Sequence, residues 1–168
     1  HVTCAATSAK LVLLGYEDGA VALFDVFGNM LDEQRDRHAS SVVAVALGAG
    51  STCDDVAASA SADGTLRANN LFNPYATANS AMLASRTGLR TRIPKGVSAI
   101  AVDPDYGKPR SGERIAYADN TGRVVLFTSG WFGGSEVLVA REDLFVQSMV
   151  WTGLLVGWSS EKGVQIYD

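Results

Sequence analysis

Four short stretches of the chain repeat one pattern, in which a polar turn containing a glycine is followed by an alternating apolar run. They are GYEDGAVALFD (15–25), SADGTLRANN (61–70), DNTGRVVLFT (119–128) and SEKGVQIYD (160–168). Glycine tolerates the positive φ that tight hairpin turns require, and the alternation gives the following strand one buried and one wetter face. The chain therefore repeats a β-hairpin, and this repeat constrains the fold more than any local feature does.

The repeat has a regular spacing. The turn glycines are Gly19, Gly64, Gly122 and Gly163, so the intervals between them are 45, 58 and 41 residues. The long middle interval contains DPDYGKPRSGE (103–113), whose proline and glycine residues indicate a loop inserted between two strands. Without most of that loop, the period returns to the mid-forties.

Each unit contains the same order of predicted strands. We predict strands at 2–6, 11–16, 20–26 and 30–34, at 42–47, 56–61, 65–72 and 80–85, at 97–102, 114–119, 123–128 and 136–140, and at 145–151, 154–158 and 164–167. Units of four antiparallel strands, with small apolar inner strands and a more polar outermost strand, are typical of β-propeller blades. Short strands separated by turns also fit a β-sandwich, but the fixed four-strand order favours the propeller.

We therefore expect an all-β fold, a partial β-propeller of about four WD-repeat-like blades. The blades are expected at approximately 1–36, 40–86, 96–141 and 144–168, and the last one lacks its fourth strand. An open propeller exposes apolar faces at its end blades and leaves strand edges unpaired. We therefore expect the chain to be a fragment of a larger propeller, and we expect residues 1–168 not to fold well alone.

The charge of the chain argues against nucleic acid as a partner. There are 14 Lys and Arg residues and 18 Asp and Glu residues, a net charge of −4, so no overall positive field attracts nucleic acid. Cys4 and Cys53 have neither a CxxC partner nor a histidine at metal-ligand spacing, which fits reduced thiols in a cytosolic protein, although a disulfide between them stays open. No run approaches the ~20 apolar residues of a membrane span. We predict neither a metal nor a cofactor.

His38 and Asp63 are predicted to form a structural hydrogen-bond network. His38 lies shortly before the inner strand predicted at 42–47, and Asp63 lies in the hairpin turn of the same unit. His1 and Asp18 stand in a similar relation in the first unit, and in WD-repeat blades such His and Asp residues commonly stabilise the blade. Catalysis would need a nucleophile with a base, paired carboxylates or a set of metal ligands, which the sequence does not supply.

Two segments are candidates for contact with a partner or a membrane. SRTGLRTRIPKG (85–96) is locally basic, and its charged residues are Arg86, Arg90, Arg92 and Lys95. Four such charges would contribute roughly 4 kcal/mol at an anionic membrane if all reached it together. SGWFGGS (129–135) places Trp131 and Phe132 on a glycine-rich turn, where exposed aromatic residues are typical of partner contacts. The basic segment also fits a solvated loop between blades, and the aromatic pair also fits packing into the neighbouring blade.

The C-terminal part of the chain resembles the propeller of the vacuolar protein sorting-associated protein 41 family, the tethering subunit of the HOPS complex. In that family an apolar LLF strand is followed by a Trp, then by a V-x-W-R-G-x-L-I-A-W pair of strands and a turn to G-V-K-I-Y-D. The matching residues here are Leu126, Phe127, Trp131, Val150, Trp151, Gly153, Leu155, Trp158, Gly163, Val164, Ile166, Tyr167 and Asp168. AIAVDPDY (99–106) and LLGYEDGAVALFDVFGNML (13–31) also resemble earlier blades, whereas Thr152 replaces the family's usual Arg.

This resemblance implies a non-enzymatic protein-interaction module of a vesicle-tethering subunit, which acts in membrane trafficking and fusion between endosomes and the vacuole or lysosome. It implies protein partners, namely a late-endosomal Rab GTPase, other HOPS subunits and adaptor proteins. It also implies a cytoplasmic location, with peripheral association on late endosome and vacuole membranes. The alternative is a generic WD-repeat scaffold that binds peptides or signalling or ubiquitin-ligase partners. A propeller hydrolase is a third interpretation, for which the sequence supplies neither a base nor a metal set.

Overall fold

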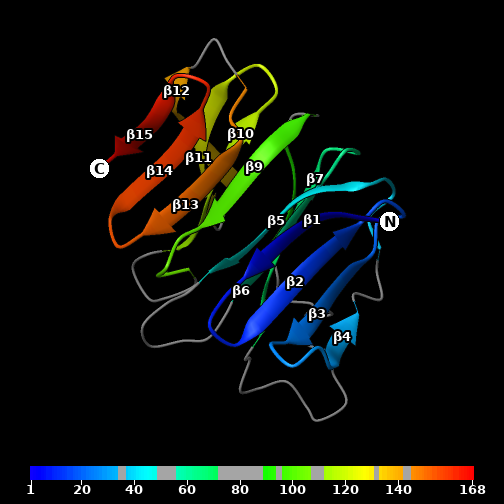
Figure 1. The fold of residues 1–168 in the computed structure, drawn as a ribbon. Coiled ribbons are helices and arrows are strands. Elements are labelled where there is room, and N and C mark those ends of the chain that lie inside the picture. Colours follow the sequence, from blue (N-terminus) through cyan, green and yellow to red (C-terminus); the bar gives the residue numbers. More distant parts are fainter. Residues whose placement is uncertain are drawn as a thin grey trace.

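Fifteen strands form four antiparallel sheets in the described part of the chain (Figure 1). The computed structural model describes residues 1–33, 37–48, 56–71, 89–93, 96–106, 112–130, 133–141 and 145–168. The sheets follow one another along the chain, and within each sheet the strands are hydrogen-bonded in sequence order. This arrangement confirms the predicted all-β, partial propeller fold.

The first sheet contains β1 (Val2–Thr7), β2 (Leu11–Tyr16), β3 (Val21–Asp25) and β4 (Met30–Glu33). The second sheet contains β5 (Val42–Gly48), β6 (Val56–Ser61), β7 (Thr65–Asn70) and β8 (Leu89–Arg92). The third sheet contains β9 (Val97–Val102), β10 (Glu113–Asp119), β11 (Arg123–Gly130) and β12 (Gly133–Arg141). The fourth sheet contains β13 (Ser148–Thr152), β14 (Leu155–Ser160) and β15 (Gly163–Tyr167).

The four repeated glycines adopt the backbone conformation that the sequence pattern predicts. Their φ values are 83° at Gly19, 82° at Gly64, 78° at Gly122 and 116° at Gly163. In the first three turns, the glycine N–H donates to the carbonyl three residues earlier, which belongs to Tyr16, Ser61 and Asp119 respectively. Because an L side chain is strained at these φ values, glycine allows each hairpin to close tightly.

The turn glycines also join successive sheets. The N–H of His38, which leads into the second sheet, donates to the Gly19 carbonyl at 2.9 Å. The N–H of Ile93, which leads toward the third sheet, donates to the Gly64 carbonyl at 2.9 Å. The hairpin turn of one sheet is therefore fixed against the segment that begins the next.

Apolar side chains are buried between consecutive sheets. Three clusters join the first sheet to the second, the second to the third, and the third to the fourth. Their best-buried members are, respectively, Leu13, Leu23 and Val42; Leu66, Ile115 and Tyr117; and Ala118, Val124 and Val146. Among the described residues, no such cluster joins the first sheet to the fourth.

The innermost strands of the sheets lie side by side near the middle of the molecule (Figure 1). Strand β5 lies against both β1 and β9, and β13 lies against β9. Small residues allow this close approach: Gly15 of the adjoining strand β2 leaves room for Cys4 of β1 and Val42 of β5, since a Cβ added to it would lie 2.6 Å from the Sγ of Cys4 and 2.6 Å from Cγ1 of Val42. Ala44 and Ala99 likewise occupy buried positions on inner strands.

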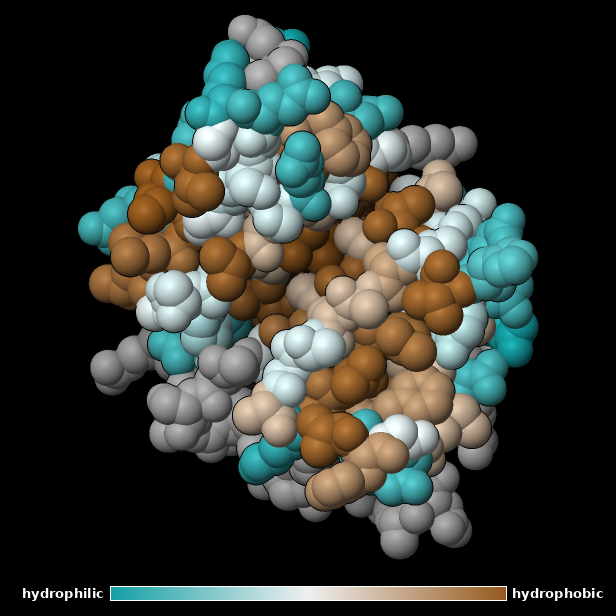
Figure 2. All heavy atoms as spheres, viewed as in Figure 1, coloured by the Kyte–Doolittle hydropathy of each residue, from teal (hydrophilic) through white to brown (hydrophobic). Residues whose placement is uncertain are grey.

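Each end sheet presents apolar side chains to solvent. On the fourth sheet Val150, Val164 and Ile166 are 59%, 76% and 68% exposed, and the register places Val150 and Ile166 on one face, across Gly157. On the first sheet Val2 and Met30 are 53% and 60% exposed. Figure 2 shows hydrophobic residues over both regions. Where two sheets are consecutive, apolar faces of this kind are buried against the neighbouring sheet.

The structure differs from the predicted strands in the second and fourth units. The outermost strand of the second sheet is β8 (Leu89–Arg92), whereas the strand predicted at 80–85 lies outside the described residues. The first strand of the fourth sheet begins at Ser148 and not at Phe145, because Val146 leaves the sheet and is fully buried in the cluster with the third sheet.

The turn at Gly19 gives a test of how tightly the sheets are joined. Gly19 and Gly28 have similar φ values, 83° and 88°, but a Cβ would lie 2.2 Å from the His38 carbonyl oxygen at Gly19 and meets nothing within 4 Å at Gly28. We expect Gly28→Ala to lower local stability by about 1 kcal/mol, through backbone strain alone. Gly19→Ala should lower local stability by about 1–3 kcal/mol more, because its Cβ would overlap the His38 carbonyl oxygen. Hydrogen exchange of the β2 and β3 amides measures the loss of stability in both variants. Equal losses would contradict the close contact between Gly19 and His38.

The exposed faces of the end sheets predict the behaviour of residues 1–168 expressed alone. We expect this segment to bind a hydrophobic dye and to self-associate, because its end faces are apolar and uncovered. The double variant Val150→Lys, Ile166→Lys should reduce both effects, which dye fluorescence and sedimentation velocity would detect. A monomeric wild-type segment with a sharp thermal transition would contradict this expectation.

Candidate functional site

The connections between strands alternate between two ends of each sheet, because consecutive strands are antiparallel. At one end lie the β2–β3, β6–β7 and β10–β11 turns, with Asp18, Asp63 and Asp119, together with the segments that lead from one sheet to the next. We call this the aspartate end. At the opposite end lie the connections that join β1 to β2, β3 to β4, β9 to β10 and β13 to β14. We call this the hairpin end.

A buried hydrogen-bond chain lies at the aspartate end of the second sheet. The Thr65 hydroxyl donates its single proton to Oδ1 of Asp63 at 2.6 Å. The Thr65 hydroxyl oxygen must therefore accept the 2.6 Å hydrogen bond from Nδ1 of His38, which fixes the proton on Nδ1. In the neutral ring Nε2 then accepts from the Ser59 hydroxyl at 2.9 Å. The structure thus links His38 to Asp63 through Thr65 and not directly.

This chain contains the elements of a nucleophile and base pair, but they are closed to substrate. Ser59 and His38 are 4% and 3% exposed, so no substrate carbonyl reaches the Ser59 hydroxyl. Instead the chain connects the segment before β5 to β6, to the β6–β7 turn and to β7. Its geometry is that of a structural brace within the second sheet.

Asp63 is the acidic terminus of this brace. Partial burial by itself would raise the pKa of its carboxyl, but the pKa is lowered because the carboxylate accepts hydrogen bonds from the Thr65 hydroxyl and from backbone N–H groups of Thr65 and Ala39. The proximity of His38 adds to the lowering. Asp63 is therefore ionised at neutral pH and holds the turn to the entry of the second sheet.

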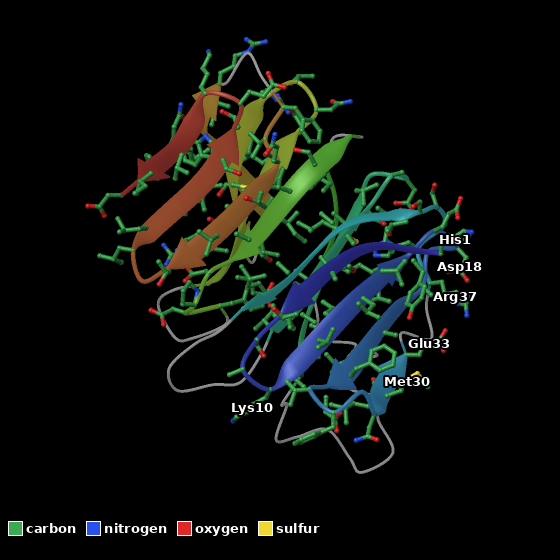
Figure 3. All side chains as sticks on the ribbon, in the orientation of Figure 1. His1, Lys10, Asp18, Met30, Glu33 and Arg37 are labelled. Atoms are coloured by element: carbon green, nitrogen blue, oxygen red, sulfur yellow. The ribbon has the colours of Figure 1, made fainter. Side chains whose placement is uncertain are left out.

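Asp18 has a different partner from the one predicted. Its Oδ2 accepts a 2.7 Å hydrogen bond from Arg37, whose other terminal nitrogen donates to Glu33 at 2.8 Å. His1 contributes through its backbone, since its carbonyl accepts from the Glu17 N–H at 2.9 Å. Figure 3 shows Asp18, Arg37 and Glu33 together at the edge of the first sheet. All three side chains are substantially exposed, so this cluster contributes little stability.

The third sheet has a buried aspartate beside the corresponding turn, at the position that Ser61 occupies in the second sheet, and sequence reasoning missed it. Asp119 is 2% exposed and accepts hydrogen bonds from the Thr121 hydroxyl at 2.6 Å and from Nε of Arg123 at 2.8 Å. Burial opposes ionisation, yet these bonds lower the pKa of its carboxyl. The signal for this site is present in the repeated turn itself, where an aspartate precedes the turn and a threonine follows two residues later.

The inner strands of all four sheets line an open cavity of about 610 Å³. Its lining consists of segments of β1, β5, β9 and β13 together with Gln147, and most of the lining side chains are apolar, with hydroxyl groups from Thr7, Ser98 and Ser148. Among the residues that the structure describes, no Asp, Glu, His, Lys or Arg side chain belongs to this lining. Such a cavity offers no group for acid–base chemistry.

The predicted contact residues are only partly placed by the structure. Arg90 and Arg92 lie on β8, two residues apart and therefore at positions on one face of the strand, opposite Arg67 and Thr65 of β7. Part of the basic segment predicted as a possible loop is thus an edge strand. Arg86, Lys95, Trp131 and Phe132 lie outside the described residues.

An exposed aromatic residue that sequence reasoning missed lies at the hairpin end. Phe27 is 87% exposed in the β3–β4 turn, and its neighbour Val26 is 51% exposed. The Asp25 carboxylate holds this turn by accepting hydrogen bonds from the N–H groups of Phe27 and Asn29, at 2.9 and 2.8 Å, and from the Asn29 side chain at 2.7 Å. The hydrogen bond from the Asn29 side chain is the main cause that lowers the pKa of Asp25.

The sequence signal for Phe27 is the segment DVFGN (25–29), in which an aspartate and a Gly-Asn pair mark a tight turn with an aromatic residue between them. Gly28 has φ of 88°, as such a turn requires. The turn therefore presents a large apolar side chain on a rigid backbone, which reduces the entropy lost when a partner binds.

The described part of the chain has neither a metal-binding cluster nor a membrane-spanning helix. Within the described ranges, no group of three or more His, Cys, Asp and Glu residues is arranged to hold a metal ion. No helix long and apolar enough to cross a membrane occurs in that part of the chain.

Comparison with known proteins identifies relatives over the full chain. A family model named for the Vps41 β-propeller, described as "Vps42 beta-propeller", matches residues 1–168. The vacuolar protein sorting-associated protein 41 homologs of Arabidopsis thaliana and Solanum lycopersicum are 28% and 26% identical over 99% of the chain, and the Schizosaccharomyces pombe protein of that name is 23% identical over 99%. The chain spans only 15%, 16% and 17% of the length of these relatives.

Solved structures share the fold. The computationally designed proteins Ika4 and Ika8 each superpose with a TM-score of 0.60, at 17% and 18% sequence identity. Both alignments cover 99% of this chain, and they cover 90% of Ika4 and 45% of Ika8. At this level of identity, the similarity concerns the fold alone.

The buried brace makes a prediction about acid stability. We expect Asp63→Asn to destabilise the second sheet by about 2 kcal/mol above pH 4, because it weakens charge-assisted hydrogen bonds. The folded-state pKa of Asp63 lies below the ordinary value of 3.8, so this stabilisation is complete above that value and is lost as the pH falls through the folded-state pKa. The difference between variant and wild type should therefore shrink at low pH.

Asp18→Asn is the matched control, in the equivalent turn of the first sheet. The Asp18 side chain is 60% exposed, so we expect its effect to stay below about 1 kcal/mol. Hydrogen exchange of the β2–β3 and β6–β7 amides between pH 2.5 and pH 7 measures both variants. Equal losses in the two sheets would refute the brace at Asp63.

Proposed function

Because the chain belongs to the Vps41 β-propeller family, we propose that it is a protein-interaction module of a vesicle-tethering subunit that acts in vacuolar protein sorting. The names of its relatives in plants and fission yeast support the sorting role. The module presents a rigid β framework to its partners, and its own residues perform no chemical reaction. Tethering and fusion of endosomal and vacuolar or lysosomal membranes are the processes in which we propose that it takes part.

The exposed turn at Phe27 is the observation that carries the docking role for this part of the chain. Its side chain is 87% exposed, and the Asp25 carboxylate fixes the backbone around it before any partner binds. Aromatic side chains dominate the energetics of many protein interfaces, since they bury a large area with few rotatable bonds. We propose the β3–β4 turn, with Val26 and Phe27, as a partner contact.

The absence of charge from the central cavity lining supports a non-enzymatic role. The buried Ser59 and His38 brace is closed to substrate, and the part of the cavity lining that the structure describes contains no acidic or basic side chain. A hydrolase requires an accessible nucleophile with a base, a pair of carboxylates or a set of metal ligands. We therefore favour the docking module over a propeller hydrolase.

The partners that we propose are proteins of the same trafficking step. By family resemblance they are a late-endosomal Rab GTPase, other HOPS subunits and adaptor proteins. Their binding would place the module in the cytoplasm, peripherally on late endosome and vacuole or lysosome membranes. The basic segment with Arg86, Arg90, Arg92 and Lys95 and the aromatic pair Trp131 and Phe132 remain candidate contacts with those partners or with the membrane.

We expect Phe27→Ser to weaken the binding of one of these partners about 30-fold, which corresponds to about 2 kcal/mol for the loss of an aromatic anchor. Folding should be unaffected, because Phe27 makes little contact with the chain. Co-purification of HOPS subunits, adaptors and the Rab GTPase with the tagged full-length protein, followed by titration of the affected partner, measures the effect.

Phe145→Ser is the matched control, since Phe145 is 53% exposed and lies in the β12–β13 connection at the aspartate end. It should leave partner binding unchanged. Full binding of every candidate partner by the Phe27→Ser protein would reject the β3–β4 turn as the contact. A protein that neither binds these partners nor restores vacuolar sorting in cells that lack it would reject the proposed function as a whole.

A further inference from the structure

The outer edge of the third sheet differs from the other outer edges. Strand β12 contains nine residues, whereas β4 and β8, the outermost strands of the first and second sheets, contain four residues each. In the described part of the chain, β12 ends its sheet and pairs only with β11. Its centre is apolar, and Val137 and Leu138 are 52% and 56% exposed.

Soluble proteins usually protect a free strand edge by shortening it, or by placing charges, proline or a bulge on it. Strand β4 is short and ends with Asp32 and Glu33. Strand β12 has one bulge, opposite Val124 and Val125, but its register with β11 is continuous from Gly133 to Leu138. Six residues of regular β-strand therefore present unpaired backbone groups along this edge.

The side chains beside this edge define what can bind there. Glu136 and Leu138 lie opposite Phe127 and Val125 and share their face of the sheet, while Ser135 and Val137 lie on the other face. The hydroxyl of buried Tyr117 donates to Oε1 of Glu136 at 2.9 Å and so holds this carboxylate at the edge. Burial and the neighbouring Glu136 raise the pKa of Tyr117, so the phenol keeps its proton and remains a donor.

We propose that β12 binds an extended peptide segment by strand addition, with an apolar side chain beside Leu138 and a Lys or Arg side chain beside Glu136. Backbone hydrogen bonds along the edge supply affinity in this mode of recognition, and alternate side chains supply specificity. The negative charge of Glu136 selects a basic residue, because opposite charges stabilise directly opposed positions on neighbouring strands.

A second copy of the chain fits this edge less well. Antiparallel pairing of two β12 strands over the regular segment places both Glu136 side chains on the same face. In the registers that overlap most, the two carboxylates are directly opposite or are diagonal neighbours, two residues apart along the strands. Like charges at such positions are destabilising, so an extended basic and apolar segment of another protein is the better occupant.

Fluorescence anisotropy with two labelled octapeptides tests this proposal on the full-length protein. The first probe is Thr-Thr-Val-Thr-Lys-Thr-Val-Thr, which presents Val, Lys and Val on one face when extended, and the second has Glu in place of Lys. We expect the Lys peptide to bind wild-type protein, and we expect Leu138→Lys to weaken this binding at least tenfold. Leu154→Lys, a substitution of another exposed leucine in the β13–β14 turn, should have no effect.

Substitutions of Glu136 test the charge of the β12 edge separately from its apolar side chains. Glu136→Gln, which keeps an acceptor for Tyr117, should weaken binding of the Lys peptide, and Glu136→Lys should reverse the preference in favour of the Glu peptide. Failure of both peptides to bind, or equal binding by the Leu138→Lys and Leu154→Lys proteins, would overturn the proposal. Wild-type protein that dimerises in sedimentation, with Leu138→Lys monomeric, would also overturn it, because a second copy would then cover the edge.

Discussion

Burial of apolar side chains between consecutive sheets is the interaction on which the rest of this structure depends. A β-sheet with an apolar face must bury that face against another element to be stable in water. Each buried Leu, Ile or Val side chain contributes about 1.5–3 kcal/mol, and the three clusters here supply such side chains from both partners at every contact. The second and third sheets are stable because both of their faces are covered, whereas each end sheet has one covered face.

The same constraint determines the distribution of residue size within a sheet. Inner strands converge, so they and their neighbours carry small residues such as Ala44 and Ala99, and at Gly15 of β2 even one added carbon would overlap Cys4 and Val42. Farther from the centre the gap between sheets widens, and Tyr117 and Phe127 fill it. The inner strands also line the central cavity, and most of its lining side chains are apolar, many of them alanine.

Most of the fold could be predicted from the sequence, because glycine turns and two-residue alternation are local signals. The strand at Leu89–Arg92 escaped prediction since LRTR has no apolar alternation, and only its pairing with β7 makes it a strand. The relation of His38 to Asp63 was predictable in outline from their places in the repeat. The place of Thr65 between them, and the hydrogen bond that His38 accepts from Ser59, could not be predicted, because they depend on the register of β6 and β7. Phe27 was visible in a turn motif, but its exposure depends on the complete packing of the first sheet.

The two ends of the sheets differ in how they are joined. At the aspartate end, backbone bonds from His38 to Gly19 and from Ile93 to Gly64 connect each sheet to the next, and Asp63 holds the entry to the second sheet. At the hairpin end, the hydrogen bonds of the β3–β4 turn stay within the first sheet. Changes in the β3–β4 turn therefore leave these bonds between sheets intact. A change in the length or sequence of that turn can alter the surface offered to a partner, while the aspartate end still holds the sheets together.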